Sequence, residues 1–220
     1  DMYCVFLGKA VQTVNPPNSS VGSSQVSADL ITGQTALGAT PADTDELLIS
    51  DAGTLKRVDY SYLKSTNTPA FSAIITEGNT QSVTTSTTTK IEFDKELIDT
   101  DSAYDPSTNY RFTVPSGEGG KYIIFGGLQV FSSSNDISQI ILYLYKNGSS
   151  FGFVQANTQS NGNRHFDVSK AFLVDASASD YFELFGFVNG TSPVFTGSGP
   201  SSPSTGTGTY FSGYKLISWG

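Results

Sequence analysis

The aromatic residues are unevenly distributed along this chain of 220 residues. Residues 1–67 contain four aromatics, and residues 68–220 contain the rest of the 15 Phe, 11 Tyr and 1 Trp. Because aromatic side chains bury the largest apolar area per residue, we expect only the second segment to build a core of its own. The polar run from Lys64 to Pro69 marks the change. We therefore place a domain boundary near Asn67, between segments 1–67 and 68–220.

The second segment predicts a succession of short strands. Apolar residues alternate in Ala70–Ile75, Lys90–Asp94 and Tyr110–Val114, which is the period of a half-buried strand. The run Ile140–Tyr145 is continuously apolar, as in a strand that is buried on both faces, and Asn147-Gly148 follows it as a tight hairpin turn. About ten such strands without a convincing helix predict an all-β sandwich or barrel. A Gly126-Gly127 pair within them predicts a bulge or a close backbone approach.

The first segment predicts an extended connector. Its residues 18–27 have the Ser- and Gly-rich composition of a linker. Two short apolar runs around Asp51-Ala-Gly53 predict a β-hairpin within residues 46–58. A lone hairpin is only marginally stable in water, so this one needs the rest of its chain or further copies of itself. Because the sequence begins with Asp1 rather than Met, we expect it to be a piece of a longer protein.

Composition argues against several functions. The 20 acidic and 12 basic residues give a net charge of −8, which argues against nucleic acid as the main partner. No apolar run is long enough to cross a bilayer, so membrane insertion is not expected. The single Cys4 and the single His165 exclude an internal disulfide framework and multi-Cys or multi-His metal sites. No Gly-x-Ser-x-Gly motif occurs, and we expect neither an enzyme nor an obligatory cofactor.

Several motifs follow one another in a fixed order along residues 68–218. They are Pro69–Ala73, Ile91–Asp94, Tyr104–Asp105, Tyr110–Pro115, Gly119–Phe125, Tyr145–Gly148, Tyr181–Leu184 and Tyr210–Ile217. In this order and spacing they resemble the C1q-like branch of the C1q/TNF superfamily. The resemblance implies a ten-stranded jelly roll that associates as a compact homotrimer. One departure is Ser179-Asp180, which stands where that family usually has a Gly-Asp turn.

A second resemblance concerns the segment Gln34–Lys64. Its residues Thr35–Leu37, Asp45–Gly53 and Leu55–Asp59 resemble a piece that recurs in tailed-phage virion proteins. Together, the two resemblances imply the C-terminal part of a tail fibre or spike tip. Such a protein would contact other virion proteins on its N-terminal side and bind a host-surface glycan or outer-membrane protein.

Other functions remain open at this stage. A capsid-decorating fibre and a purely structural tail part belong to the same class, and a secreted C1q-like binding protein belongs to another. A glycan depolymerase would need paired carboxylates in a groove, and no such pair stands out in the sequence.

Candidate sites come from loops, because loops on a rigid sandwich usually carry recognition. Residues 196–209 contain only Thr, Ser, Gly and Pro, and together with the Asn147-Gly148 turn they are the predicted ligand-binding surface. The predicted contact residues are Asn147, Gly148, Thr196, Ser198, Ser201, Ser204 and Thr207. Three carboxylates in another predicted loop, Asp99, Asp101 and Asp105, could chelate calcium, and the alternative is a solvated acidic loop.

The apolar strands also predict a subunit interface. Ile140–Tyr145 and Tyr181–Phe187 are apolar on both faces, and only one face of each can fill the sandwich. The other face would leave a patch larger than soluble monomers usually expose. We therefore predict that trimer formation covers Tyr143, Tyr145, Tyr181, Phe185 and Phe187.

Overall fold

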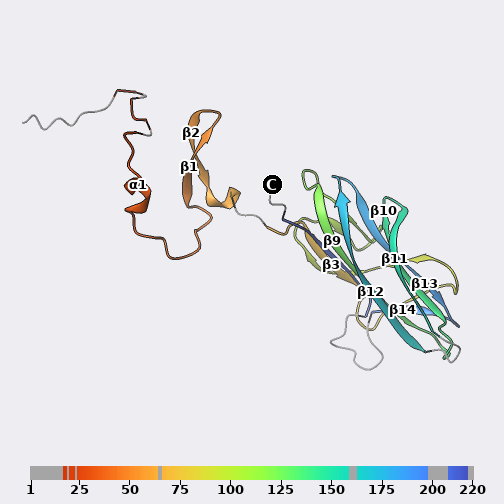
Figure 1. The fold of residues 1–220 in the computed structure, drawn as a ribbon. Coiled ribbons are helices and arrows are strands. Elements are labelled where there is room, and N and C mark those ends of the chain that lie inside the picture. The colour runs from red at the N-terminus through yellow and green to blue at the C-terminus, as the bar shows by residue number, and fades with distance from the viewer. Residues whose placement is uncertain are drawn as a thin grey trace, which may run out of the picture. The chain divides into compact units, whose positions relative to one another are not determined.

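The computed structural model describes residues 17–18, 20–22, 24–63, 66–158, 163–197 and 208–217. The chain divides into two compact units, Asp1–Lys64 and Ser65–Gly220 (Figure 1). The described residues contain only two short helical segments, α1 (Asp29–Thr32) and a 3-10 turn (Tyr60–Tyr62). Neither is long and apolar enough to cross a membrane. The predicted all-β class is confirmed.

The first unit contains one β-hairpin in its described residues. Strands β1 (Glu46–Asp51) and β2 (Thr54–Asp59) pair antiparallel around a turn in which Ala52 and Gly53 have φ angles of +48° and +84°. The hairpin expected from the sequence is therefore present, and it extends to Asp59. No large hydrophobic side chain in the described part of this unit is buried.

The second unit is a sandwich of two antiparallel sheets (Figure 1). One sheet has the strand order β11 (Ser149–Asn157), β10 (Gln139–Lys146), β13 (Tyr181–Asn189), β8 (Arg111–Thr113), β7 (Tyr104–Asp105), with β5 (Thr89–Lys90) beside β13. The other has the order β4 (Thr80–Ser82), β14 (Val194–Thr196), β9 (Gly120–Phe131), β15 (Tyr210–Lys215), β3 (Ala70–Ile74), β6 (Lys95–Asp99), with β12 (His165–Ala176) beside β9. More strands are present than the predicted ten, because several have only two or three residues and are too short to show a period.

Aromatic side chains fill the space between the two sheets. Phe71 of β3 stacks on Phe112 of β8 with ring centroids 4.4 Å apart, and Phe211 of β15 meets Phe71 edge-on at 4.8 Å. All three rings are buried. Stacked and edge-on pairs of this kind contribute more than their buried area alone. The aromatic-rich segment therefore supplies the core, as its composition predicted.

The Gly126-Gly127 pair lies in the middle of β9, where β9 pairs with β12 without a shift of register. No bulge is present. A Cβ atom on Gly127 would lie 2.1 Å from the Tyr210 ring, so only glycine lets this ring cross the strand. Of the two alternatives that the sequence left open, the close approach is confirmed.

The segment Ile91–Asp94 is not a strand, although its alternation predicted one. Ile91 and Phe93 are buried, so the two-residue period does report which side chains point inward. A regular strand ladder is absent because the backbone N–H groups of this segment have other hydrogen-bond partners. The Ile91 N–H donates to the carbonyl of Leu184, and the Glu92 N–H donates to the side chain of Gln81.

Candidate functional site

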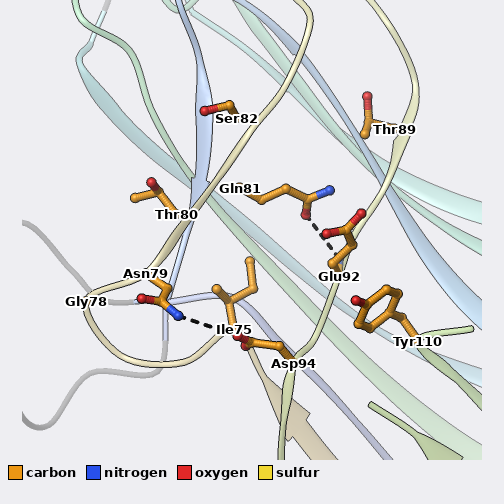
Figure 2. Close-up of a pocket in the computed structure, with 10 residues that line it drawn as sticks. All are labelled: Ile75, Gly78, Asn79, Thr80, Gln81, Ser82, Thr89, Glu92, Asp94 and Tyr110. Carbon is orange, nitrogen blue, oxygen red and sulfur yellow. Dashed lines mark hydrogen bonds between the residues drawn. The ribbon is translucent and has the colours of Figure 1, made fainter. Parts of the chain in front are cut away.

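A polar groove of about 760 Å³ lies where the turn after β3, strand β4 and the segment 91–94 meet. Figure 2 shows the residues that line it. They are Ile75, Gly78, Asn79, Thr80, Gln81, Ser82, Thr89, Glu92, Asp94 and Tyr110. The volume is within the usual range for small-ligand sites.

Gln81 holds two sides of the groove together. Its Nε2 donates to the Lys90 carbonyl at 2.8 Å, and its Oε1 accepts from the Glu92 N–H at 3.0 Å. One side-chain amide thus satisfies two backbone groups that a neighbouring strand would otherwise satisfy. Because unpaired buried backbone groups are costly, this contact explains how the segment after β5 can leave the sheet and line the groove.

Asp94 is fixed at one end of the groove. Its Oδ1 accepts from the Thr76 N–H at 2.6 Å. Its Oδ2 accepts from Asn79 Nδ2 at 3.5 Å (Figure 2). The turn that carries Asn79 is closed by the bond from the Asn79 N–H to the Thr76 carbonyl, and it passes through Gly78 at a φ of +83°. The Asp94 carboxylate is therefore held in place by the fold, and the Asn79 amide lies beside it.

Tyr110 contributes its ring from a strained backbone. Its φ of +48° lies in the left-handed region, which costs a bulky residue roughly 1–2 kcal/mol. The loop before it is organised by Asp105, whose carboxylate accepts from the N–H groups of Ser107, Thr108 and Asn109. These backbone bonds hold the pKa of the Asp105 carboxyl well below its usual range. The strain is thus maintained by a rigid loop, a pattern that is common at binding sites.

The groove is acidic and rich in hydrogen-bonding groups. Glu92 and Asp94 both line it and are both exposed, and none of its ten lining residues is Lys or Arg. Carboxylates, amides and hydroxyls can bind the hydroxyl groups of a ligand, and the ring of Tyr110 can pack against C–H groups. Two uncompensated carboxylates would repel a sulfated or phosphorylated ligand. The chemistry therefore fits a neutral or cationic polyhydroxylated ligand.

The three carboxylates predicted to bind calcium form turn contacts. Asp99 accepts from the N–H groups of Asp101 and Tyr104, Asp101 accepts from the Thr100 hydroxyl, and Asp105 organises its own loop. Among the residues that the structure describes, no three His, Cys, Asp or Glu side chains form a cluster that could hold a metal ion. Asp101 and Asp105 line a second cavity of about 350 Å³, together with Arg111. The calcium site stays a prediction that the geometry does not support.

Three of the predicted ligand-binding residues lie in the described structure, and the side chains of Asn147 and Thr196 are bonded within the fold. Asn147 and Gly148 form the β10–β11 turn with φ angles of +52° and +76°, and the Asn147 side chain is bonded to Asp180 and to the Tyr181 N–H. Thr196 is buried at the end of β14, where its hydroxyl donates to Gln129. Ser198, Ser201, Ser204 and Thr207 lie outside the described residues.

The predicted interface aromatics lie together on the outer face of one sheet. Tyr143 and Phe185 are directly opposite in the β10–β13 ladder, and the rings of Tyr145 and Phe185 are 4.2 Å apart. All five residues are half-buried. Phe153, 52% exposed and opposite Tyr143, extends this aromatic face to the edge strand.

No sequence pattern marks the residues that define the groove. Asn79, Gln81, Glu92 and Asp94 look like ordinary polar residues of a loop, and nothing in the sequence pairs them. The alternation of apolar residues predicts a strand that begins at Tyr110, and no local pattern indicates the left-handed backbone of this residue. The Thr-rich run at 80–89 is the one signal available, because a polar run beside strong strands favours an exposed, hydrogen-bonding surface.

The antiparallel two-sheet topology defines the second unit as a jelly-roll-type β-sandwich, in which the first strand of the unit, β3, pairs with its last strand, β15. No protein-family model and no curated protein matches the chain. Among solved structures, it is similar to the globular domain of zebrafish complement 1qA protein, at 15% identity and a TM-score of 0.47, over 68% of this chain and 98% of that one. It is also similar to Eiger TNF from S. frugiperda, at 11% identity and a TM-score of 0.48, over 67% and 92% of the two chains.

Proposed function

We propose that the chain is a structural and adhesive component of a phage virion, a tail fibre or spike tip, which acts as a homotrimer and binds a host-surface saccharide in the groove around Tyr110. The observation that carries the binding function is the groove itself. It combines the ring of Tyr110, which projects from a strained backbone, with the fixed carboxylate of Asp94 and the fixed amide of Gln81. Preorganised polar groups of this kind reduce the ordering that binding costs.

The dimensions of the groove favour a saccharide over a protein receptor. A volume of about 760 Å³ accommodates a few sugar units, whereas a stable protein contact needs roughly 800 Å² of surface on each partner. Its acidic lining favours neutral or amino sugars over sialylated or phosphorylated ones. The loop 196–209 remains a proposed additional contact, and shortening it to a tight turn should weaken adsorption to host cells without unfolding the sandwich.

The virion assignment is supported by the segment Gln34–Lys64 and its resemblance to phage virion proteins. It is tested by labelling intact particles with antibodies against the sandwich. Label at the tail tip would support the fibre or spike, and label on the capsid would indicate a decorating fibre. A protein found in culture medium without particles would indicate the secreted alternative.

The binding proposal is tested by titrating host-surface polysaccharide fragments into the purified chain in a calorimeter. Tyr110→Asn removes the ring, and Asn tolerates the left-handed backbone, so the fold should survive. We expect it to weaken binding about tenfold, in line with roughly 1.4 kcal/mol of lost contact. Asp94→Asn should weaken binding through loss of a charged acceptor.

Asp175→Asn is the matched control, because this carboxylate is exposed and lies outside the groove, where it pairs with Lys121. Unchanged binding in both groove variants would overturn the proposed site. The same fragments are also assayed for new reducing ends. Their release would show that the chain cleaves the polysaccharide and that binding is only the first step.

A further inference from the structure

We propose that the β1–β2 hairpin is a self-association element, in which three copies pack around a common axis through the face formed by Leu47, Ile49 and Val58. The proposal rests on the homotrimer proposed above and names the surface that the connector contributes to it. The partner of the hairpin is thus two further copies of the same chain.

The described part of the first unit has no hydrophobic core of its own. Of the 17 large hydrophobic side chains exposed in the described structure, 11 belong to this unit: Val21, Val26, Leu30, Ile31, Leu37, Leu47, Leu48, Ile49, Leu55, Tyr62 and Leu63. A two-stranded hairpin alone is marginally stable in water. The hairpin is nevertheless regular over six paired positions, so its sequence specifies a structure whose apolar face needs a cover.

The register of the hairpin separates its two faces. Leu47 lies opposite Val58, and Ile49 follows two residues later on the same side, so these three side chains form one continuous apolar patch. On the other side, Leu48 lies opposite Arg57, and Leu55 lies opposite Ser50. Each of those leucines is therefore opposite a polar residue. On the first face Ile49 is likewise opposite Lys56, whose ammonium group pairs with Asp51, and the difference between the faces is the fully apolar pair Leu47–Val58. The first face is the better packing surface.

The charges of the hairpin favour copies of itself over a charged partner. Residues 46–59 carry three acidic and two basic side chains, a net charge of −1 in a chain whose total is −8. Arg57 pairs with Glu46, and Lys56 pairs with Asp51, both at 2.5 Å. Because the charges are compensated within each hairpin, three hairpins can approach one axis with little repulsion. Cyclic symmetry then covers the same face in every copy.

The test is disulfide trapping in the whole chain. In a Cys4→Ser background, Ile49→Cys places one thiol per chain on the proposed inner face, and Leu48→Cys places one on the outer face as the matched control. A three-fold axis brings Ile49 of one copy close to its equivalents, within the short Cα separation that a disulfide needs. Each trimer can form one such disulfide, so mild oxidation with copper phenanthroline should link up to about two thirds of the chains into dimers. The Leu48→Cys chain should be linked several-fold less.

Light scattering on the same samples separates the possible failures. A trimeric mass without preferential linking at position 49 would overturn the hairpin proposal and leave the homotrimer standing. Equal linking at positions 48 and 49 would show random collision and would also overturn the proposed face. A monomeric mass with no linking at either position would overturn the hairpin proposal and the homotrimer together.

Discussion

Asn147 and Asp180 are joined by a hydrogen bond of 2.7 Å, from Nδ2 to Oδ1, that connects the turn after β10 to the turn before β13. Asp180 also accepts from Lys146 Nζ and from the Ser177 N–H, both at 2.8 Å. In return, Asn147 Oδ1 accepts from the Tyr181 N–H at 2.9 Å. Two turns that are 33 residues apart thus form one polar network at an end of the six-stranded sheet. The Asn147 N–H also donates to the Tyr181 carbonyl at 3.0 Å, so both the side chain and the backbone N–H of Asn147 stabilise the fold.

Because of this network, the free energy of unfolding should fall at acid pH. The hydrogen bonds from Lys146, Asn147 and Ser177 lower the pKa of the Asp180 carboxyl to about 2, from an ordinary value of 3.8. Because the folded state holds the proton less tightly than the unfolded state, Asp180 stabilises the fold above pH 3.8 and loses this effect as the pH falls towards 2. Urea titrations at several pH values should show the loss in the wild type. Asp180→Asn should remove that part of the pH dependence and lower stability at neutral pH by roughly 1.5–3 kcal/mol.

The control for Asp180→Asn is Asp175→Asn, which removes a carboxylate from an exposed ion pair. Asp175 is paired with Lys121, but its side chain is 79% exposed, and exposed pairs contribute little to stability. A loss at neutral pH as large in Asp175→Asn as in Asp180→Asn would show that the network around Asp180 has no special role.

Ser179 occupies a position that suits glycine. Its φ of +71° lies in the left-handed region, where a Cβ atom is strained. We expect Ser179→Gly to raise the free energy of unfolding by about 0.5–1 kcal/mol, because the relief of strain exceeds the added entropy of the unfolded chain. Ser150→Gly, at an exposed strand position without a positive φ, should instead lower it by a similar amount. Thermal unfolding of both variants measures the difference, and a destabilised Ser179→Gly would contradict the explanation.

Gln81 should matter for stability although it lies in β4, a short polar strand. Gln81→Leu leaves the Lys90 carbonyl and the Glu92 N–H without their partner, which should cost roughly 1–3 kcal/mol. Gln155→Leu is the control, because Gln155 is exposed and contacts only the Asn157 side chain among the described hydrogen bonds. That change should stay within about 0.5 kcal/mol. Equal urea midpoints for the two variants would show that the groove wall does not depend on Gln81.

The fold could be predicted from sequence to the extent that it depends on local pattern. The alternation in Tyr110–Val114 and the Asn147-Gly148 turn both predict elements that the structure contains, because a two-residue period and a left-handed turn are properties of neighbouring residues. The same alternation in Ile91–Asp94 predicts the burial correctly and the ladder wrongly. There the partner of the Glu92 N–H is the Gln81 side chain, eleven residues away, and periodicity contains no information about it.

The groove could not be predicted, because its residues meet only in three dimensions. Asp94 and Thr76 are 18 residues apart, and their contact depends on the turn at Gly78. Asp105 is an example of a residue whose hydrogen-bond partners the sequence pattern does not reveal. Its neighbours Asp99 and Asp101 made it look like part of a cation site, whereas it accepts hydrogen bonds from its own loop. A list of carboxylates does not reveal which ones already have partners.

The last prediction concerns the aromatic face of the six-stranded sheet, which we expect to be covered in a homotrimer. Light scattering of the chain should give about three times 23.4 kDa. The double variant Tyr143→Ser and Phe185→Ser removes two rings that face each other across β10 and β13, so it should dissociate the assembly. The nearby Glu183 carboxylate does not oppose assembly of this face, because its charge is paired with Lys90 Nζ at 2.5 Å.

Leu173→Ser distinguishes this face from the outer face of the other sheet. Leu173 lies on β12, is 63% exposed and is opposite Ile123 of β9, so it belongs to a second apolar surface. If the aromatic face is the interface, Leu173→Ser should remain trimeric at low micromolar concentration while the double variant becomes a monomer. Dissociation by Leu173→Ser alone would move the interface to the seven-stranded sheet. A stable 23.4 kDa species for the unmodified chain would refute the homotrimer, because the half-buried aromatics would then be adequately covered by their contacts with one another.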